Sequence, residues 1–146
     1  MERHKIIPAS YLLLFRNDKI LLSRRFNTGY EDGNYSVPAG HVEQGETFTG
    51  CLIREAKEEI GVIIKPKDLK VTHVMCRNSG TKENNERIDV FFVVTKWTGD
   101  IENKEPHKCE DISWFDIDNL PNNIIPYIRD AINNTKNEIF YSEKGW

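Results

Sequence analysis

The sequence has 146 residues, of which 38% are hydrophobic and 29% are charged, with a formal net charge of −3 and a pI near 5.8. This is the size of one domain with enough apolar residues for a core, so we expect residues 1–146 to form a single domain. The composition argues against a disordered chain, and the absence of a basic excess argues against binding duplex DNA through its phosphates.

No apolar run approaches the roughly 20 residues that span a bilayer, and the charged N-terminal residues precede no signal-peptide core. The three cysteines, Cys51, Cys76 and Cys109, are odd in number and have no paired spacing. This pattern favours free thiols in a reducing cytosol over a disulfide framework or a zinc knuckle. We therefore expect a soluble, cytoplasmic protein with no membrane partner.

Short apolar runs separated by turn residues predict strands in the first third of the chain. Tyr11–Phe15 and Ile20–Leu22 flank a short turn and are expected to pair as a hairpin. Residues 26–34 are rich in Gly and Asn, which predicts a loop, and Tyr35–Pro38 is expected to be a brief extended piece.

The second half of the chain predicts strands separated by polar loops, then a helix. We expect strands at Val71–Cys76, Ile88–Trp97 and Ile112–Phe115, a mobile polar loop at Arg77–Arg87 and another polar loop at Gly99–Glu110. Apolar residues at 124, 125, 128 and 132 recur at helical spacing, with Asn122 or Asn123 as N-cap and Pro126 in the first turn. The tail from about residue 136 is expected to be peripheral. This mixture indicates an α/β or α+β sandwich.

Residues 40–62, GHVEQGETFTGCLIREAKEEIGV, carry the clearest chemical pattern in the chain. Thr47 can cap a helix that runs to about Ile60, and Gly61 can end it as a left-handed glycine. Five acidic and two basic residues lie between positions 43 and 59, so the local charge equals that of the whole chain. The acidity is therefore concentrated in this helix and the loop before it.

Three glutamates of this helix, Glu55, Glu58 and Glu59, fall within about 100° of one another on a helical wheel. A solvated acidic face is the simpler interpretation. However, Glu55 and Glu59 project from the same side as the apolar stripe, while Arg54 and Lys57 point elsewhere. Carboxylates on a core-facing side need partners. A divalent metal is one such partner, and all-oxygen ligands favour magnesium or manganese over zinc.

The segment resembles the signature of the Nudix hydrolases: Gly, five residues, Glu, seven residues, Arg-Glu-apolar, one residue, Glu-Glu, one residue, Gly-apolar. The matching positions are Gly40, Glu46, Arg54, Glu55, Ala56, Glu58, Glu59, Gly61 and Val62. Ala56 is the one soft match, because Ile, Leu or Val is commoner there. The resemblance implies the family's α/β/α sandwich around a mixed β-sheet, with residues 40–62 as its catalytic loop-helix-loop.

The resemblance also implies roles for these residues. It implies Mg²⁺ as cofactor, with Mn²⁺ as the alternative, and a set of ligands for that ion: Gly40, Glu55, Glu58 and Glu59. Glu55 is the first candidate for the general base that activates water. Arg54 and Glu46 look like the family's pair that orients the catalytic glutamates, although a surface bridge from Arg54 to Glu58 is the alternative.

Residues outside the segment add candidates. Some family members take a ligand or base from a later loop, and Glu105 or Glu110 is suitably placed, although each is more often simply solvated. Arg25 resembles a family arginine that holds a terminal phosphate, with Arg24 as its neighbour. Ser36 belongs to an approach, residues 34–36, that we expect to recognise the base together with residues 122–127.

The substrate is expected to be a small nucleotide and not a nucleic acid polymer. The compact length and the late Trp114-Phe115 and Leu120-Pro121 pairs resemble the MutT-like nucleoside triphosphate pyrophosphohydrolases. The downstream residues typical of the ADP-ribose, diadenosine polyphosphate and NADH branches are absent. We expect a nucleoside triphosphate, including oxidised forms, to yield a nucleoside monophosphate and pyrophosphate.

Two alternative functions remain open, and a third is rejected. The substrate can be another nucleoside diphosphate derivative such as a nucleotide sugar. The domain can also bind nucleotides without catalysis, although relatives that have lost catalysis usually lose carboxylates that this sequence keeps. An acidic calcium-binding protein fits poorly, because no EF-hand loop is present. The family resemblance suggests a homodimer.

Overall fold

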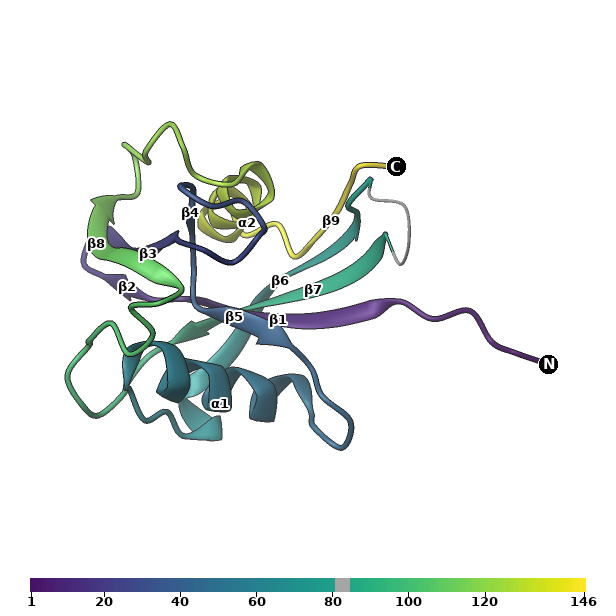
Figure 1. Ribbon diagram of the computed structural model, residues 1–146, viewed down its shortest axis with the longest axis horizontal. Helices are drawn as coiled ribbons and strands as arrows, with labels where there is room; N and C mark the ends of the chain where they lie inside the picture. Colours follow the sequence, from purple (N-terminus) through teal and green to yellow (C-terminus); the bar gives the residue numbers. More distant parts are fainter. Residues whose placement is uncertain (81–84) are drawn as a thin grey trace.

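Within residues 1–80 and 85–146, which the computed structural model describes, the chain forms two β-sheets, two α-helices and a short 3₁₀-helix, η1 (Pro66–Asp68) (Figure 1). The centre of the predicted mobile loop Arg77–Arg87 lies outside the described residues. In the part that is described, no helix has the length and apolar character needed to cross a membrane.

The larger sheet has five strands in the order β5-β1-β7-β6-β9. In chain order these are β1 (Ile7–Leu13), β5 (Ala39–His41), β6 (Leu69–Asn78), β7 (Glu86–Val94) and β9 (Tyr141–Lys144). The pairs β1–β7 and β6–β9 are parallel, whereas β1–β5 and β6–β7 are antiparallel, so the sheet is mixed, as predicted.

The smaller sheet is antiparallel and centres on β3, which pairs with β2, β4 and β8. Its strands are β2 (Phe15–Arg16), β3 (Lys19–Arg25), β4 (Tyr35–Ser36) and β8 (Cys109–Asp116). The predicted hairpin is correct only for β2 and β3. The rest of the apolar run belongs to β1 in the other sheet, because that segment finds its hydrogen-bond partners in β7, far along the chain.

Several predicted boundaries are wrong by a few residues. Gly40 lies in β5 rather than in a loop, and the ends of the predicted loop Arg77–Arg87 continue β6 and β7. These polar stretches pair because β6 and β7 are antiparallel neighbours over almost their whole length, including Arg77 with Arg87. At the other end, β7 stops at Val94 rather than Trp97.

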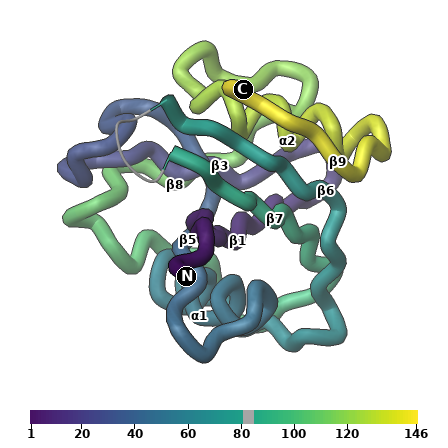
Figure 2. The backbone as a smooth tube through the Cα atoms, turned by 90° about the vertical axis from the view of Figure 1, so that its right-hand side faces the viewer, coloured from purple at the N-terminus to yellow at the C-terminus, as the bar shows by residue number. Residues whose placement is uncertain are grey.

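The helices α1 (Phe48–Ile60) and α2 (Pro126–Lys136) lie on opposite sides of the five-stranded sheet (Figures 1 and 2). Successive side chains of a strand point to opposite faces. Accordingly, Phe92 packs in the cluster that contains Leu52 of α1, and Phe91 packs in the cluster that contains Ile128 of α2. The predicted α/β/α sandwich is confirmed, with the smaller sheet beside α2.

The two helices begin in different ways. The Thr47 hydroxyl accepts a hydrogen bond from Gly50 N at 2.9 Å, as predicted for α1. The predicted Asn cap of α2 is wrong, because the cap position is Ile125 and no side chain caps the helix. Asn123 instead donates to the Gly33 carbonyl at 2.9 Å, and Pro126 begins the helix at a position where its missing N–H costs nothing.

The C-terminal residues correct the expectation of a peripheral tail, because residues 141–144 form β9 at the edge of the larger sheet. The C-terminal segment also contacts the side chain of His73, which is fully buried. His73 Nδ1 lies 2.7 Å from the Ile139 carbonyl, which can only accept, so Nδ1 is the donor. The Ser142 hydroxyl lies 2.7 Å from Nε2 and completes the pairing of the ring.

We predict that Ser142→Ala lowers the free energy of unfolding by about 1–3 kcal/mol, because it removes a hydrogen-bond partner of a buried ring nitrogen. Urea denaturation followed by tryptophan fluorescence measures the change. Glu143→Ala, at an exposed neighbouring position of β9, is the control and should change stability by less than about 0.5 kcal/mol. Equal effects of the two substitutions would show that β9 does not support the core through His73.

Candidate active site

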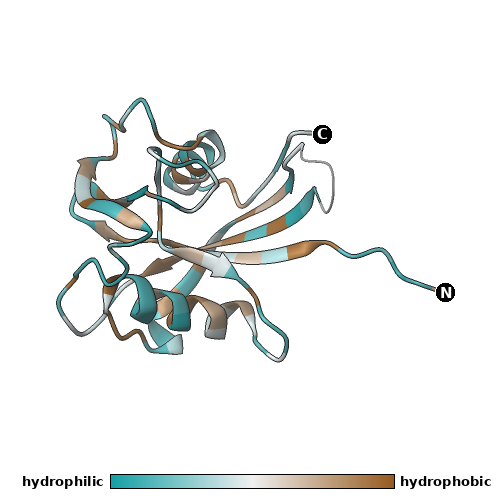
Figure 3. Cartoon of the chain, in the orientation of Figure 1, coloured by the Kyte–Doolittle hydropathy of each residue, from teal (hydrophilic) through white to brown (hydrophobic). Residues whose placement is uncertain are grey.

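The C-terminal half of α1 is hydrophilic (Figure 3). Two of its glutamates, Glu55 and Glu59, nevertheless lie against β5. Glu59 Oε2 accepts a hydrogen bond from Ala39 N at 3.0 Å. A Cβ added to Gly40 would lie 2.2 Å from Glu55 Oε1, so the lack of a side chain at position 40 makes room for this carboxylate. The helical-wheel prediction for these two glutamates is confirmed, whereas the Glu58 side chain is 51% exposed.

Arg54 connects the glutamates to the preceding loop. Its Nε and Nη2 donate to the two carboxylate oxygens of Glu46 at 2.7 and 2.9 Å, a bidentate pair. Its Nη1 donates to Glu55 at 2.7 Å and to Glu58 at 3.4 Å. The predicted pair of Arg54 with Glu46 is present, and so is the alternative contact of Arg54 with Glu58.

Burial and neighbouring charges shift the pKa values of Glu46, Glu55 and Glu59 in different directions. The hydrogen bonds from Arg54 lower the pKa of Glu46 to about 2. Burial raises the pKa of Glu55, and the pairing with Arg54 opposes this shift. Burial, together with the charge of Glu55, raises the pKa of Glu59 well above its usual value. Glu55 and Glu59 thus lie where the ionised form needs a nearby positive charge.

Among the residues that the structure describes, no three His, Cys, Asp or Glu side chains already converge as a metal site. Arg54 Nη1 lies between Glu55 and Glu58 and supplies one positive charge there. The donor set nevertheless fits a hard divalent cation. Buried Glu59 needs such a charge, Glu58 is exposed enough to turn, and Gly40 leaves its backbone close to Glu55.

A cavity of about 780 Å³ adjoins these glutamates. It is lined by nearly all the residues singled out in the sequence: Arg25, Ser36, Gly40, Arg54, Glu55, Glu58, Glu59 and Glu105. Glu46 does not line it, but holds Arg54 through the bidentate pair. Glu110 instead forms an ion pair with Arg24 at 3.2 Å.

The two segments expected to recognise a base lie side by side. Tyr35 N donates to the Asn123 carbonyl and Ile125 N to the Tyr35 carbonyl, both at 2.9 Å. Ser36 from one segment and Tyr127 from the other line the cavity. Arg25 also lines it, while its Nε donates to the Tyr30 carbonyl at 2.6 Å.

Sequence reasoning missed several residues of the cavity wall, among them Tyr11, Arg77, Arg87 and Lys108. Tyr11 looked like part of an apolar strand, and both arginines looked like part of a polar loop. Only the pairing of β1, β6 and β7 places them beside the glutamates of α1. A short stretch of sequence cannot predict which distant strands will pair in this way.

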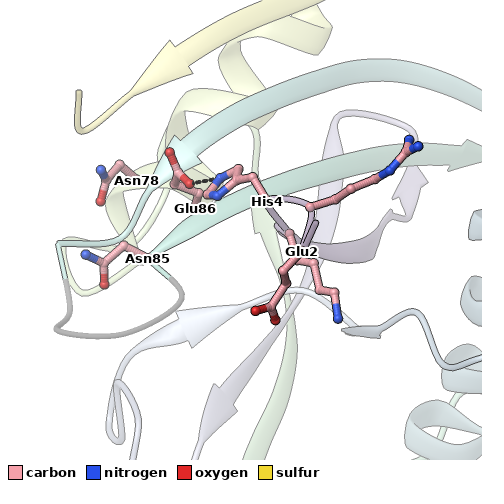
Figure 4. A pocket seen from close by; sticks show the side chains of 7 residues that line it. Glu2, His4, Asn78, Asn85 and Glu86 are labelled. Carbon is pink, nitrogen blue, oxygen red and sulfur yellow. Dashed lines mark ion pairs between the residues drawn. The ribbon is translucent and has the colours of Figure 1, made fainter.

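A second hollow lies near the N-terminal tail and the adjoining ends of β6 and β7 (Figure 4). It is lined by Glu2, Arg3, His4, Lys5, Asn78, Asn85 and Glu86, and His4 pairs with Glu86. Most of the tail is exposed, and none of the predicted site residues reaches this hollow. We therefore place the candidate active site in the cavity beside α1.

The comparisons with known proteins identify the class as hydrolases that act on phosphoanhydride bonds. The family model described as NUDIX domain matches residues 5–134. The chain therefore belongs to the Nudix family, whose members act on nucleotide-derived substrates and generally need a divalent metal.

Curated relatives and solved structures agree with this placement. The chain is 32% identical over 117 residues to the NAD-capped RNA hydrolase NudC of Stutzerimonas stutzeri and 36% identical over 117 residues to that of Chromobacterium violaceum. These matches cover 80% of this chain but only 39% and 40% of the relatives, so the chain spans about two fifths of their length.

Among solved structures, the MutT NUDIX hydrolase from Burkholderia pseudomallei superposes with a TM-score of 0.78 at 21% identity. The match covers 89% of this chain and 98% of that one. At this level of identity the similarity establishes the fold, and the substrate has to be argued from the site.

We predict that Gly40→Ala lowers turnover about tenfold or more without unfolding the protein. The added Cβ would overlap Glu55, whose flexible carboxylate must then move away from β5. Steady-state kinetics and circular dichroism measure the two effects. Gly50→Ala, on the same helix but with only the Thr47 hydroxyl close by at 3.3 Å, should keep near-normal turnover. Full activity of Gly40→Ala would contradict the proposed position of Glu55.

Proposed function

We propose that this chain is a Mg²⁺-dependent pyrophosphohydrolase that converts a nucleoside triphosphate to a nucleoside monophosphate and pyrophosphate. The supporting observation is that Glu55 and Glu59 turn from α1 against β5, at the wall of a cavity large enough for a nucleotide. We further propose that residues 1–146 act as one domain.

The residues that would hold the cation are Gly40 through its carbonyl, together with Glu55, Glu58 and Glu59. Glu105 also lines the cavity, from a loop in which Lys104 N donates to the Glu59 carbonyl at 3.0 Å, and it is a further candidate ligand. When bound, Mg²⁺, or Mn²⁺ in its place, offsets the charge of the polyphosphate and makes a water molecule easier to deprotonate.

The proton transfer is assigned to Glu55. Burial raises the pKa of its carboxyl, which makes its carboxylate a better base toward an attacking water. Arg54 donates to Glu55 at 2.7 Å, and the bidentate pair with Glu46 fixes Arg54 in turn. Arg54 and Glu46 therefore act as positioning residues for Glu55.

Substrate binding is assigned to the other walls of the cavity. Arg25, at the end of β3, would contact a phosphate, and Ser36 would contact the nucleoside beside Tyr127. Ser36 is buried to 4% exposure, so an incoming polar group would find a hydroxyl already shielded from solvent.

A second candidate is hydrolysis of a dinucleotide such as NAD or of an NAD-capped RNA. It is favoured by the relatives named NudC, at 32–36% identity, and it runs against the expectation that no nucleic acid polymer is a partner. The downstream motif of the NADH branch is absent from this sequence, which favours the nucleoside triphosphate.

Product analysis separates these candidates. The protein is incubated with Mg²⁺ and a panel of nucleoside triphosphates, oxidised nucleoside triphosphates, nucleotide sugars, NAD and NAD-capped RNA. We expect a nucleoside triphosphate to give the highest kcat/KM, with pyrophosphate as product. Preferred cleavage of NAD or NAD-capped RNA would establish the second candidate, and no cleavage of any compound would refute the proposed hydrolase.

We predict that Glu58→Gln reduces kcat about 100-fold or more while the thermal midpoint changes little, because this side chain is half-exposed and its proposed task is to bind the cation. Glu102→Gln removes the same charge from an exposed position that pairs with Lys104, and it should retain full activity. A Glu58→Gln enzyme with wild-type turnover would remove Glu58 from the ligand set.

A further inference from the structure

Two arginines form a positive wall in the same cavity as the glutamates. Arg77 on β6 and Arg87 on β7 are direct cross-strand partners, and both line the cavity. Like charges placed directly opposite each other in a sheet are destabilising. The fold therefore needs to compensate for this pair.

The charge of Arg77 is compensated within the protein. Its Nε donates to Asp89 Oδ2 at 2.6 Å, and the hydroxyl of Tyr11 donates to Asp89 Oδ1 at 2.9 Å. The guanidinium also stacks over the ring of Tyr127, with 3.7 Å between Cζ and the ring centroid. Asp89 is fully buried, so its carboxylate is committed to these partners.

Arg87 differs from Arg77 because one of its guanidinium nitrogens has no partner. Its Nη1 is buried and has no hydrogen-bond partner, and it is the one such side-chain nitrogen or oxygen found in residues 1–80 and 85–146. A buried donor without a partner costs roughly 1–3 kcal/mol, and more when the group is charged. Asp89, the nearby carboxylate, already binds Arg77 and Tyr11. Arg87 therefore lines the cavity with a guanidinium whose buried Nη1 has no hydrogen-bond partner.

The distance between the two walls limits what Arg87 can contact. In the sheet register, Gly40 lies opposite Ser10, which lies opposite Val90, three residues beyond Arg87. Two strand spacings and three residues put the Cα atoms of Gly40 and Arg87 ~14 Å apart. An arginine side chain reaches part of this way. Its guanidinium can therefore meet a phosphate other than one held directly at the glutamates.

We propose that Arg87 binds a phosphate oxygen of the substrate, at a subsite that Arg77 and Asp89 hold in shape. This inference rests on the proposed function, because it takes the substrate to be a polyphosphate. The planar guanidinium suits a phosphate in two ways: it offers parallel donors and it keeps its charge at every working pH. When the guanidinium turns toward the cavity, the phosphate supplies the hydrogen bond that Nη1 lacks.

The test compares Arg87→Met and Arg87→Lys with the wild-type protein, using kinetics on the best substrate of the panel. We expect Arg87→Met to raise KM about tenfold or more, as expected for loss of one charge-assisted hydrogen bond, with kcat within about threefold. Arg87→Lys should give an intermediate KM, because lysine keeps the positive charge but lacks the parallel donors of the guanidinium. Arg3→Met, which removes an equal charge from the exposed N-terminal tail, should leave KM unchanged.

Calorimetric binding of inorganic pyrophosphate gives a readout that does not need turnover. We expect the wild-type protein to bind pyrophosphate at least about tenfold more tightly than Arg87→Met, while the thermal midpoint of Arg87→Met is no lower than that of the wild-type protein. An unchanged KM, equal pyrophosphate affinities, or no pyrophosphate binding by the wild-type protein would each overturn the subsite. Failure of the wild-type protein to cleave any nucleotide would instead refute the proposed function, while pyrophosphate binding would still test Arg87.

Discussion

The contact between α1 and β5 is the constraint on which the site depends. Glu59 accepts a hydrogen bond from Ala39 N, and Glu55 lies where any side chain at position 40 would stand. This contact shields two carboxylates from water, and the burial raises their pKa values. Their ionised forms therefore need a positive charge nearby. Arg54 meets part of this demand, and a divalent cation would meet the rest.

The layered fold gives the cavity two chemically different walls. One wall comes from α1 and β5 and is acidic, whereas the other comes from β6 and β7 and carries Arg77 and Arg87. A polyphosphate with its cation would be complementary to both walls at once, since the carboxylates would hold the cation and the arginines would contact free phosphate oxygens. The smaller sheet closes the cavity with Arg25 and Ser36.

The helix α1 could be predicted in detail because its information is local. Thr47, Gly61 and the side on which Glu55 and Glu59 project follow from caps and periodicity. Other features depend on distant partners. The Asn cap of α2 fails because Asn123 binds Gly33, and β9 and the wall formed by Arg77 and Arg87 exist only through pairing with strands far along the chain. No short sequence pattern encodes such pairing.

Titration of Mn²⁺ monitored by electron paramagnetic resonance tests the central claim most directly, because it reports the cation and not the reaction. The wild-type protein and Glu59→Gln are compared, with circular dichroism to verify that both are folded. The account predicts that Glu59→Gln weakens Mn²⁺ binding about tenfold or more. Equal Mn²⁺ affinity of the two folded proteins would contradict the claim that the enclosed glutamates of α1 hold the metal.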